Sequence, residues 1–212
     1  KDGSKRLLRL VATDGHRLSL VHRQLSRKDT FQLEKGAIIP RKGLHELKKL
    51  AEEEGDGVIK FSFTDNACVI EKDPYTVFVR LIEGEFPNYQ QVIPKDNKHR
   101  IVSSKDDFLK TLRRVSLLSN EKFRGVLFSL SENNLELSIS NPDMGEAKED
   151  LKVDFSSKTK IEVRFNPRYV LDILGAVDRE KVLIQLGDSL GPGIFSGEGD
   201  EGTLNIVMPM RV

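Results

Sequence analysis

The sequence predicts an α+β fold built from repeated units, each made of one strand, one helix and three further strands. Apolar residues alternate with polar ones in several short segments, which indicates strands with one buried face. Three other segments carry apolar residues at helical spacing, and they begin near residues 41, 105 and 167. Because these starts are about sixty residues apart, we expect the same unit to recur along the chain.

The first predicted element is a β-hairpin formed by residues 8–13 and 16–22, with Asp14-Gly15 as its two-residue turn. Glycine supplies the positive φ angle that such a turn requires. The same segment admits a second interpretation, in which Asp14 and His16 form a metal-binding or acid/base pair. We favour the turn, because two side chains are fewer ligands than a metal site needs.

The first helix is expected to follow Pro40 and to be followed by a strand at residues 58–63. Its predicted apolar stripe consists of Leu44, Leu47, Leu50 and Ala51. Ser104 and Asn166 are the expected N-caps of the second and third helices, and Pro167 fits a first helical turn. The stripes of these two helices are Phe108, Leu109, Leu112 and Val115, and Val170, Ile173, Leu174 and Val177.

Further strands are predicted around residues 135–139, 161–165 and 182–186. The glycines of residues 197–202 have the spacing of a dinucleotide-binding loop. Three acidic residues there would repel a pyrophosphate and no helix follows, so we predict a hairpin turn. Leu204, Ile206 and Met208 then alternate with their neighbours, which predicts a docked strand up to the last residue.

The repeat divides the chain into two predicted domains. Residues 97–212 hold two complete units, whereas residues 1–96 hold one unit and the last two strands of another. We therefore expect residues 1–96 to be an incomplete domain whose opening part precedes Lys1. The turn-rich segment 94–97 marks the boundary.

Composition excludes several classes of protein. Cys68 is the single cysteine, so a disulfide framework is excluded and a reducing cytoplasm is expected. No apolar run is long enough to cross a membrane. The net charge is +1, but residues 1–50 carry 13 Lys/Arg against 5 Asp/Glu. This basic region indicates either a face directed at phosphates or a chance cluster.

Four separated segments, in the right order, resemble the bacterial DNA polymerase III beta subunit, the family of ring-shaped sliding clamps. They are Thr13-Asp14-Gly15-His16-Arg17-Leu18, Glu85-Phe86-Pro87-Asn88-Tyr89, Ser119-Asn120-Glu121-Lys122-Phe123-Arg124-Gly125-Val126 and Met208-Pro209-Met210-Arg211-Val212. The resemblance implies the DNA-clamp fold, with antiparallel sheets outside and helices facing the pore. It also implies that residues 1–96 are part of a middle domain and residues 97–212 a whole C-terminal domain.

The resemblance implies a pocket that binds short peptide motifs of partner proteins. The residues that match its lining are Thr13, Gly15, His16, Arg17, Leu18, Pro87, Val92, Asn166, Tyr169, Val207, Met208, Pro209, Met210 and Arg211. Leu18, Val92 and the two terminal Met residues would supply an apolar groove, since Met adapts to different partners. The alternative is that these residues only seal a domain interface.

The resemblance also implies a face that touches DNA and a contact between subunits. Arg41, Lys42, Lys48 and Lys49 are the expected DNA-binding residues, and they would contact phosphates without reading bases. A solvated helix face is the alternative. Leu117 and Leu118 match the subunit interface of a homodimeric ring.

The function implied by the resemblance is that of a DNA polymerase processivity factor without catalysis or cofactor. Such a clamp would encircle duplex DNA independently of sequence in the bacterial cytoplasm and nucleoid, away from membranes. It would tether the replicative polymerase, the clamp loader and repair proteins in turn. Two other functions stay open: a metal-dependent nucleic-acid hydrolase using Asp14 and His16, and a peptide-binding adaptor without a DNA role.

Overall fold

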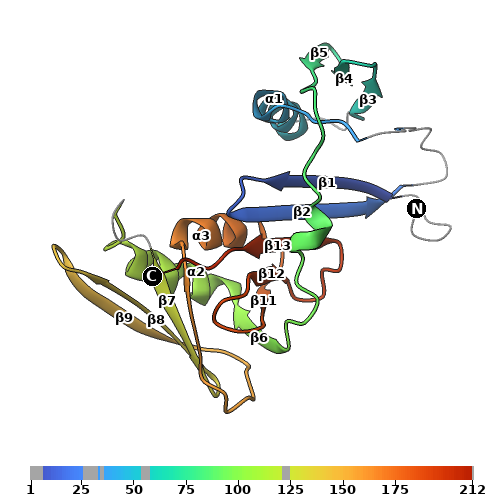
Figure 1. Cartoon of the computed structure of the whole chain (residues 1–212). Helices are drawn as coiled ribbons and strands as arrows, with labels where there is room; N and C mark the ends of the chain where they lie inside the picture. Colours follow the sequence, from blue (N-terminus) through green and yellow to red (C-terminus); the bar gives the residue numbers. More distant parts are fainter. Residues whose placement is uncertain (1–6, 26–32, 34–35, 54–57, 121–124, 212) are drawn as a thin grey trace. The chain divides into compact units, whose positions relative to one another are not determined.

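Figure 1 shows the computed structural model of the chain, which describes residues 7–25, 33, 36–53, 58–120 and 125–211. The chain divides into two compact units. The larger unit comprises Lys1–Leu25 and Gln91–Val212, and the smaller unit comprises Ser26–Gln90. A short 3-10 helix, η1 (Tyr89–Val92), spans the point where one unit follows the other in sequence.

The described part of the larger unit contains two antiparallel sheets and two α-helices. Its elements are β1 (Leu7–Thr13), β2 (Arg17–Gln24), β6 (His99–Ser104), α2 (Lys105–Ser116), β7 (Val126–Ser131), β8 (Asn134–Asn141), β9 (Gly145–Lys152), β10 (Ile161–Phe165), α3 (Pro167–Ala176), β11 (Lys181–Leu186), β12 (Gly193–Gly197) and β13 (Thr203–Val207). The six-stranded sheet has the order β1-β2-β13-β12-β11-β6, and the four-stranded sheet has the order β10-β7-β8-β9.

The predicted strand–helix–three-strand repeat is present twice in the larger unit. The first copy is β6-α2-β7-β8-β9 and the second is β10-α3-β11-β12-β13. The two copies exchange their first strands, since β6 pairs with β11 and β10 pairs with β7. Each sheet therefore takes three strands from one copy and the opening strand of the other, so neither copy completes its sheet alone.

The core of the larger unit is formed by inward-facing residues of both sheets and of the two helices. Phe108, Phe128, Phe165 and Phe195 are at most 1% exposed. Each ring meets the next one in this order edge to face, and the centroid distances of the three pairs are 6.0, 5.3 and 5.7 Å. This is the arrangement that aromatic pairs prefer, and it connects α2, β7, β10 and β12.

Helices α2 and α3 begin where the sequence predicts. Ser104 Oγ accepts a hydrogen bond from the Asp107 N–H at 3.3 Å, and Asn166 Oδ1 accepts one from the Arg168 N–H at 3.0 Å. Both predicted N-caps are therefore confirmed. The predicted stripes are buried except for Leu109, which is half-buried.

The smaller unit contains α1 (Arg41–Glu52) and a three-stranded sheet in the order β3-β4-β5. Its strands are β3 (Lys60–Phe63), β4 (Ala67–Lys72) and β5 (Tyr75–Arg80). Leu50 packs in a core with Cys68, Ile70 and Val79. The strand expected before α1 is not formed within residues 36–40, although the Ile82 N–H donates to the Ile38 carbonyl at 2.8 Å.

The predicted stripe of α1 is partly wrong. Leu44 is 38% exposed and Ala51 is also exposed, whereas Gly43 is buried. A Cβ atom on Gly43 would lie only 2.4 Å from Val79 Cγ1. The helix therefore approaches β5 through the residue that has no side chain, and this rotates Leu44 away from the core.

Lys72 is a buried lysine at the end of β4, with 6% of its surface exposed. Its ammonium donates hydrogen bonds to the Leu50 and Glu53 carbonyl oxygens at 2.7 and 2.8 Å. These carbonyls lie at the C-terminal end of α1, where helical oxygens lack partners within the helix. Lys72 thus caps α1 from the neighbouring sheet.

Two predicted details of the chain ends are corrected. The hairpin turn lies one residue later than predicted, because the Asp14 N–H donates to the Arg17 carbonyl at 3.4 Å and leaves Gly15 and His16 as the central residues. Gly15 has the expected positive φ of 86°. The final strand ends at Val207, because Met208 and Met210 donate their N–H groups to carbonyls outside β12. Val212 lies outside the described residues.

The hairpin of β1 and β2 adds to the sheet of the C-terminal strands. β2 pairs with β13 over five positions, among them Leu18 with Ile206 and Arg17 with Val207. The hairpin therefore belongs to the larger compact unit, although it precedes the predicted boundary at residue 96. Since a sheet can continue from one domain into the next, the division at residue 96 stays a prediction.

Candidate functional site

The turn between β1 and β2 is held by the Asp14 carboxylate. Its Oδ1 accepts hydrogen bonds from the N–H groups of His16 and Arg17, both at 3.0 Å. Thr13 Oγ1 donates to the Arg17 carbonyl at 2.8 Å and accepts from the Gly15 N–H at 3.2 Å. Burial opposes ionisation of Asp14, but these two N–H groups and the Arg17 guanidinium together lower its pKa.

The Arg17 guanidinium is held by two carboxylates and one aromatic ring. Its Nε donates to Asp14 Oδ2 at 3.1 Å, and its Nη1 donates to Asp172 Oδ2 at 2.6 Å. Its central carbon lies 4.4 Å from the centre of the Tyr169 ring, within the range of a cation–π contact. Burial opposes the charge, but the hydrogen bonds to Asp172 and Asp14 raise the pKa of Arg17.

The C-terminal segment lies beside this cluster. After β13 ends at Val207, the Met208 N–H donates to the His16 carbonyl at 2.9 Å. The Met210 N–H then donates to the Arg164 carbonyl at 2.8 Å, one residue before the end of β10. The segment is therefore fixed at two points by backbone hydrogen bonds, although it is not a strand.

The structure brings most of the residues predicted to line the peptide pocket into one region of the larger unit. The β1–β2 hairpin around its turn, the start of α3 with its N-cap, and the end of β13 with the segment after it supply Thr13, Gly15, His16, Arg17, Leu18, Asn166, Tyr169, Val207, Met208, Pro209, Met210 and Arg211. Val92 belongs to the same unit, at the end of η1, and is 47% exposed. Pro87 belongs to the smaller unit.

The apolar residues of this region differ in exposure. Met208 is 41% exposed, and Pro209 and Met210 are half-buried. Leu18 and Val207 are only 4% and 0% exposed. A ligand can therefore touch Met208 directly, whereas it reaches Leu18 or Val207 only after neighbouring side chains move.

Sequence reasoning did not identify Asp172, and it considered Asp14 as a turn residue or as a metal-binding or acid/base residue, without predicting its contact with Arg17. Asp172 lies three residues after Tyr169 on α3, so both side chains point to the same side of the helix. That spacing was visible in the sequence. What the sequence did not show was that Arg17, from the other end of the chain, lies against that side.

The predicted DNA-binding residues lie along α1 of the smaller unit, and all four are exposed. Lys48 pairs with Glu52 at 3.5 Å and Lys49 with Glu46 at 2.9 Å on the same helix. Among the described residues, no carboxylate lies within ion-pair distance of Arg41 or Lys42. These two occupy the first turn, where helix dipoles disfavour positive charge, so they do not serve to stabilise the helix.

The end of α2 carries the two leucines predicted for the subunit interface. Leu117 is 75% exposed, whereas Leu118 is half-buried and packs against the core. The Asn141 side chain donates to the Leu118 carbonyl at 2.8 Å, which fixes this end of the helix. Residues 121–124 of the matching segment lie outside the described residues.

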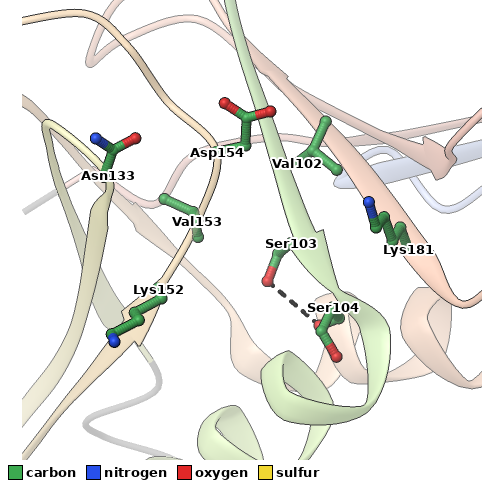
Figure 2. A pocket seen from close by; sticks show the side chains of 8 residues that line it. All are labelled: Val102, Ser103, Ser104, Asn133, Lys152, Val153, Asp154 and Lys181. Carbon is green, nitrogen blue, oxygen red and sulfur yellow. Dashed lines mark hydrogen bonds between the residues drawn. The ribbon is translucent and has the colours of Figure 1, made fainter.

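Two hollows of the larger unit lie away from these residues. The first, of about 360 Å³, is lined by Val102, Ser103, Ser104, Asn133, Lys152, Val153, Asp154 and Lys181 (Figure 2). Its two lysines lie on opposite sides of the view and do not converge. The second, of about 590 Å³, has Arg23 and Arg179 beside Asp178 and Asp200 in its lining. Neither hollow therefore favours a ligand of one particular charge.

The described residues contain no group of three or more His, Cys, Asp or Glu side chains placed to hold a metal ion. None of their helices combines the length and the apolar character that a membrane crossing requires.

Comparisons with known proteins identify the family of the chain. Residues 2–88 match the family model of the DNA polymerase III beta subunit, central domain, and residues 90–211 match the model of its C-terminal domain. The beta sliding clamp of Pseudomonas putida is 32% identical over 211 residues, which are 99% of this chain and 56% of that protein. The Escherichia coli beta sliding clamp is 34% identical over 205 residues, covering 97% of this chain and 55% of that protein.

Solved structures agree with these matches. A sliding clamp from Bartonella birtlesii bound to griselimycin aligns with a TM-score of 0.92 and 33% identity, over 100% of this chain and 56% of the other. A DNA polymerase III subunit beta from Pseudomonas aeruginosa aligns with a TM-score of 0.90 and 32% identity, over 97% and 55%. The chain spans about half the length of the relatives it matches. Because the two family models together cover nearly all of the chain, it belongs to the DNA polymerase III beta subunit family.

Proposed function

We propose that this chain acts within a ring-shaped sliding clamp, a non-catalytic processivity factor that keeps a DNA polymerase on its template. The observation that carries the proposal is the alignment of the whole chain with 56% of a solved sliding clamp, at a TM-score of 0.92 and 33% identity. In such a ring the function is topological, so no catalytic group is required. Encircled duplex DNA would be contacted through its phosphates, independently of sequence.

The proposed peptide site consists of the Arg17 region and the segment after β13. It would receive a short motif with apolar anchors from the replicative polymerase, the clamp loader or repair proteins. The exposed Met208 supports this role, since Met surfaces adapt to several partners. The solved Bartonella birtlesii clamp is bound to griselimycin, and we propose that this chain also binds that molecule.

The proposed DNA contact is the N-terminal turn of α1. Arg41 and Lys42 combine with the positive end of the helix dipole, and their charges are not paired with carboxylates in the described chain. Lys48 and Lys49 would contribute less, because each is paired with a glutamate of the same helix. The exposed Leu117, with Leu118 beside it, would join a second subunit in a homodimeric ring in the bacterial cytoplasm.

A hydrolase that uses Asp14 as an acid or base is not favoured by the geometry. The carboxylate already accepts two backbone N–H groups and the Arg17 side chain, and its pKa is lowered. A general base works best when its pKa lies near the working pH. Asp14 is therefore a structural turn residue in this proposal.

The proposal is tested by binding experiments with the chain itself. Fluorescence anisotropy measures a labelled peptide that contains Gln followed by Leu and Phe anchors, and unlabelled griselimycin serves as the competitor. We expect micromolar peptide affinity, because the few contacts in a small groove leave only a modest binding free energy after the cost of ordering the peptide. Griselimycin should displace the peptide fully. Peptide binding without any salt-dependent binding to duplex DNA would instead favour an adaptor without a DNA role. The absence of both would refute the proposal.

A further inference from the structure

We propose that Asp172 is a positioning residue of the peptide site, which holds the Arg17 guanidinium over the Tyr169 ring. This inference rests on the proposed peptide-binding function of the same region. It adds a residue on helix α3 that does not belong to the predicted pocket lining. Asp172 would act through Arg17 and would not need to touch the peptide.

The geometry fixes Arg17 from three directions. Asp172 Oδ2 accepts from Nη1 at 2.6 Å, and Asp14 Oδ2 accepts from Nε at 3.1 Å. The Tyr169 ring covers one face of the guanidinium, whose central carbon is 4.4 Å from the ring centre. An arginine side chain has many rotamers in water, and each of these contacts removes part of that freedom before a ligand arrives.

The fixed guanidinium keeps donors for a ligand. Within the described chain, Arg17 uses Nε and Nη1 for its hydrogen bonds to carboxylates and not Nη2, and its side chain is 33% exposed. Nη2 carries two N–H donors in the plane of the guanidinium. A peptide oxygen that binds there meets a donor pair already in place, so the entropy of ordering Arg17 is not lost on binding.

The position of the cluster connects it to the C-terminal segment. Arg17 is the register partner of Val207, and the next residue, Met208, donates its N–H to the carbonyl of His16. The polar donor of Arg17 therefore comes from the start of β2, and the exposed Met208 side chain comes from the residue that directly follows its partner strand β13. A peptide with one polar group and one apolar anchor fits such a pair of neighbouring features.

The test compares Asp172→Ala with the control Asp178→Ala. Asp178 lies in the loop after α3 and carries the same charge as Asp172, but the carboxylate that accepts from Arg17 Nη1 is that of Asp172. Affinity for the labelled Gln–Leu–Phe peptide is measured by calorimetry. We expect Asp172→Ala to raise the Kd roughly three- to tenfold, the range expected when a partly exposed charge-assisted hydrogen bond is lost. Asp178→Ala leaves the Kd unchanged, and Asp172→Asn, which keeps an acceptor, gives a smaller rise.

Two further measurements separate positioning from general stability. In an Arg17→Ala background, Asp172→Ala causes no additional loss of affinity, because its effect passes through Arg17. In the proton–nitrogen NMR spectrum, the Arg17 Nε–H signal, assigned with Arg17→Lys, shifts in Asp172→Ala and stays in place in Asp178→Ala. Thermal unfolding of each variant confirms that it is folded.

The outcomes distinguish this inference from the function on which it rests. If the wild-type chain binds the peptide and Asp172→Ala binds equally well, the inference is refuted and the peptide site stands. The same holds if Asp172→Ala weakens binding equally with and without Arg17. If the wild-type chain does not bind the peptide at all, the peptide site fails and the inference fails with it.

Discussion

The Met208 N–H donates a hydrogen bond to the His16 carbonyl at 2.9 Å, and this contact joins segments from opposite ends of the described chain. It uses backbone atoms only, so the Met208 side chain is left free and 41% exposed. A substitution at Met208 therefore changes the surface of the proposed peptide site without removing the contact that docks the terminal segment.

Met208→Asp is expected to weaken peptide binding at least about fivefold. An apolar anchor contributes roughly 1.5–3 kcal/mol when it is fully buried, and a carboxylate at this position would lose part of that contact. The melting temperature should change little, because the side chain is exposed and the backbone hydrogen bond remains. Fluorescence anisotropy and a thermal unfolding curve measure the two quantities.

Met144→Asp is the matched control for this experiment. Met144 is 55% exposed and precedes β9, away from the terminal segment in the sheet order of the larger unit. It should keep the affinity of the wild-type chain. Equal loss of affinity in both variants would show that Met208 has no specific role. Leu18→Asp is a poorer test, because Leu18 is 4% exposed and a buried carboxylate destabilises the fold itself.

The two basic pairs of α1 are expected to differ in their effect on DNA binding. Arg41→Ala with Lys42→Ala should weaken binding to duplex DNA more than Lys48→Ala with Lys49→Ala, although both double variants remove two charges. The reason is that Lys48 and Lys49 are partly neutralised by Glu52 and Glu46. The slope of log affinity against log salt should fall by about 0.9 for each lost phosphate contact.

Stability provides a second readout for the same variants. Positive charge at a helix N-terminus opposes the dipole, so Arg41→Ala with Lys42→Ala should raise the stability of α1 by a few tenths of a kcal/mol. Lower DNA affinity together with unchanged or higher stability identifies these residues as binding residues. Equal salt slopes for the two double variants would contradict the assignment.

The local elements of the fold were predictable because they depend on neighbouring residues. The caps at Ser104 and Asn166 and the stripes of α2 and α3 follow from spacing within one turn of helix. The exposure of Leu44 was not predictable, because it depends on the close approach of Gly43 to Val79 from a strand far along the chain. The buried Lys72 has the same origin, since its acceptors lie on α1.

The candidate site was predictable in its residues and not in its contacts. The resemblance supplied Arg17, Tyr169 and Met208, whereas the ion pair between Arg17 and Asp172 depends on β2 pairing with β13 beside α3. Pairing between strands far apart in sequence leaves no local signal. The end of β13 at Val207 was missed for the same reason, because the partners of Met208 and Met210 are non-local carbonyls.

The Asp14 carboxylate makes the stability of the hairpin depend on pH. Its folded-state pKa is lowered, so its charged form contributes stability above the unfolded value of about 4, and this contribution is lost as the pH falls through the folded value. Asp14→Asn keeps an acceptor for the His16 and Arg17 N–H groups and removes the charge. The wild-type chain should therefore be more stable than the variant at pH 7, by about 0.5–1 kcal/mol.

As the pH falls below about 4 and through the lowered folded-state pKa, this difference should shrink towards zero, because the wild-type carboxylate also becomes protonated. Urea unfolding of both proteins at pH 7 and at a series of pH values below 4 measures the change, and the other carboxylates cancel because both proteins contain them. A stability difference that stays the same over the whole pH range would show that the charge of Asp14 does not stabilise the hairpin.

Gly43 and Gly175 form a matched pair that tests the close approach of α1 to its sheet. Both lie within helices, and replacement of a helical glycine by alanine ordinarily gains about 0.5–1 kcal/mol. Gly175 has no atom within 4 Å of an added Cβ, so Gly175→Ala should be stabilising by that amount.

Gly43→Ala places its Cβ 2.4 Å from Val79 Cγ1 and 3.3 Å from Ile39 Cγ2. Overpacking of this kind costs roughly 1–3 kcal/mol, which exceeds the gain in helix propensity. Gly43→Ala should therefore be destabilising, and hydrogen exchange should localise the loss to the amides of α1. Stabilisation by Gly43→Ala would mean that α1 lies farther from β5 than the structure shows, and it would restore Leu44 as a candidate for the buried face.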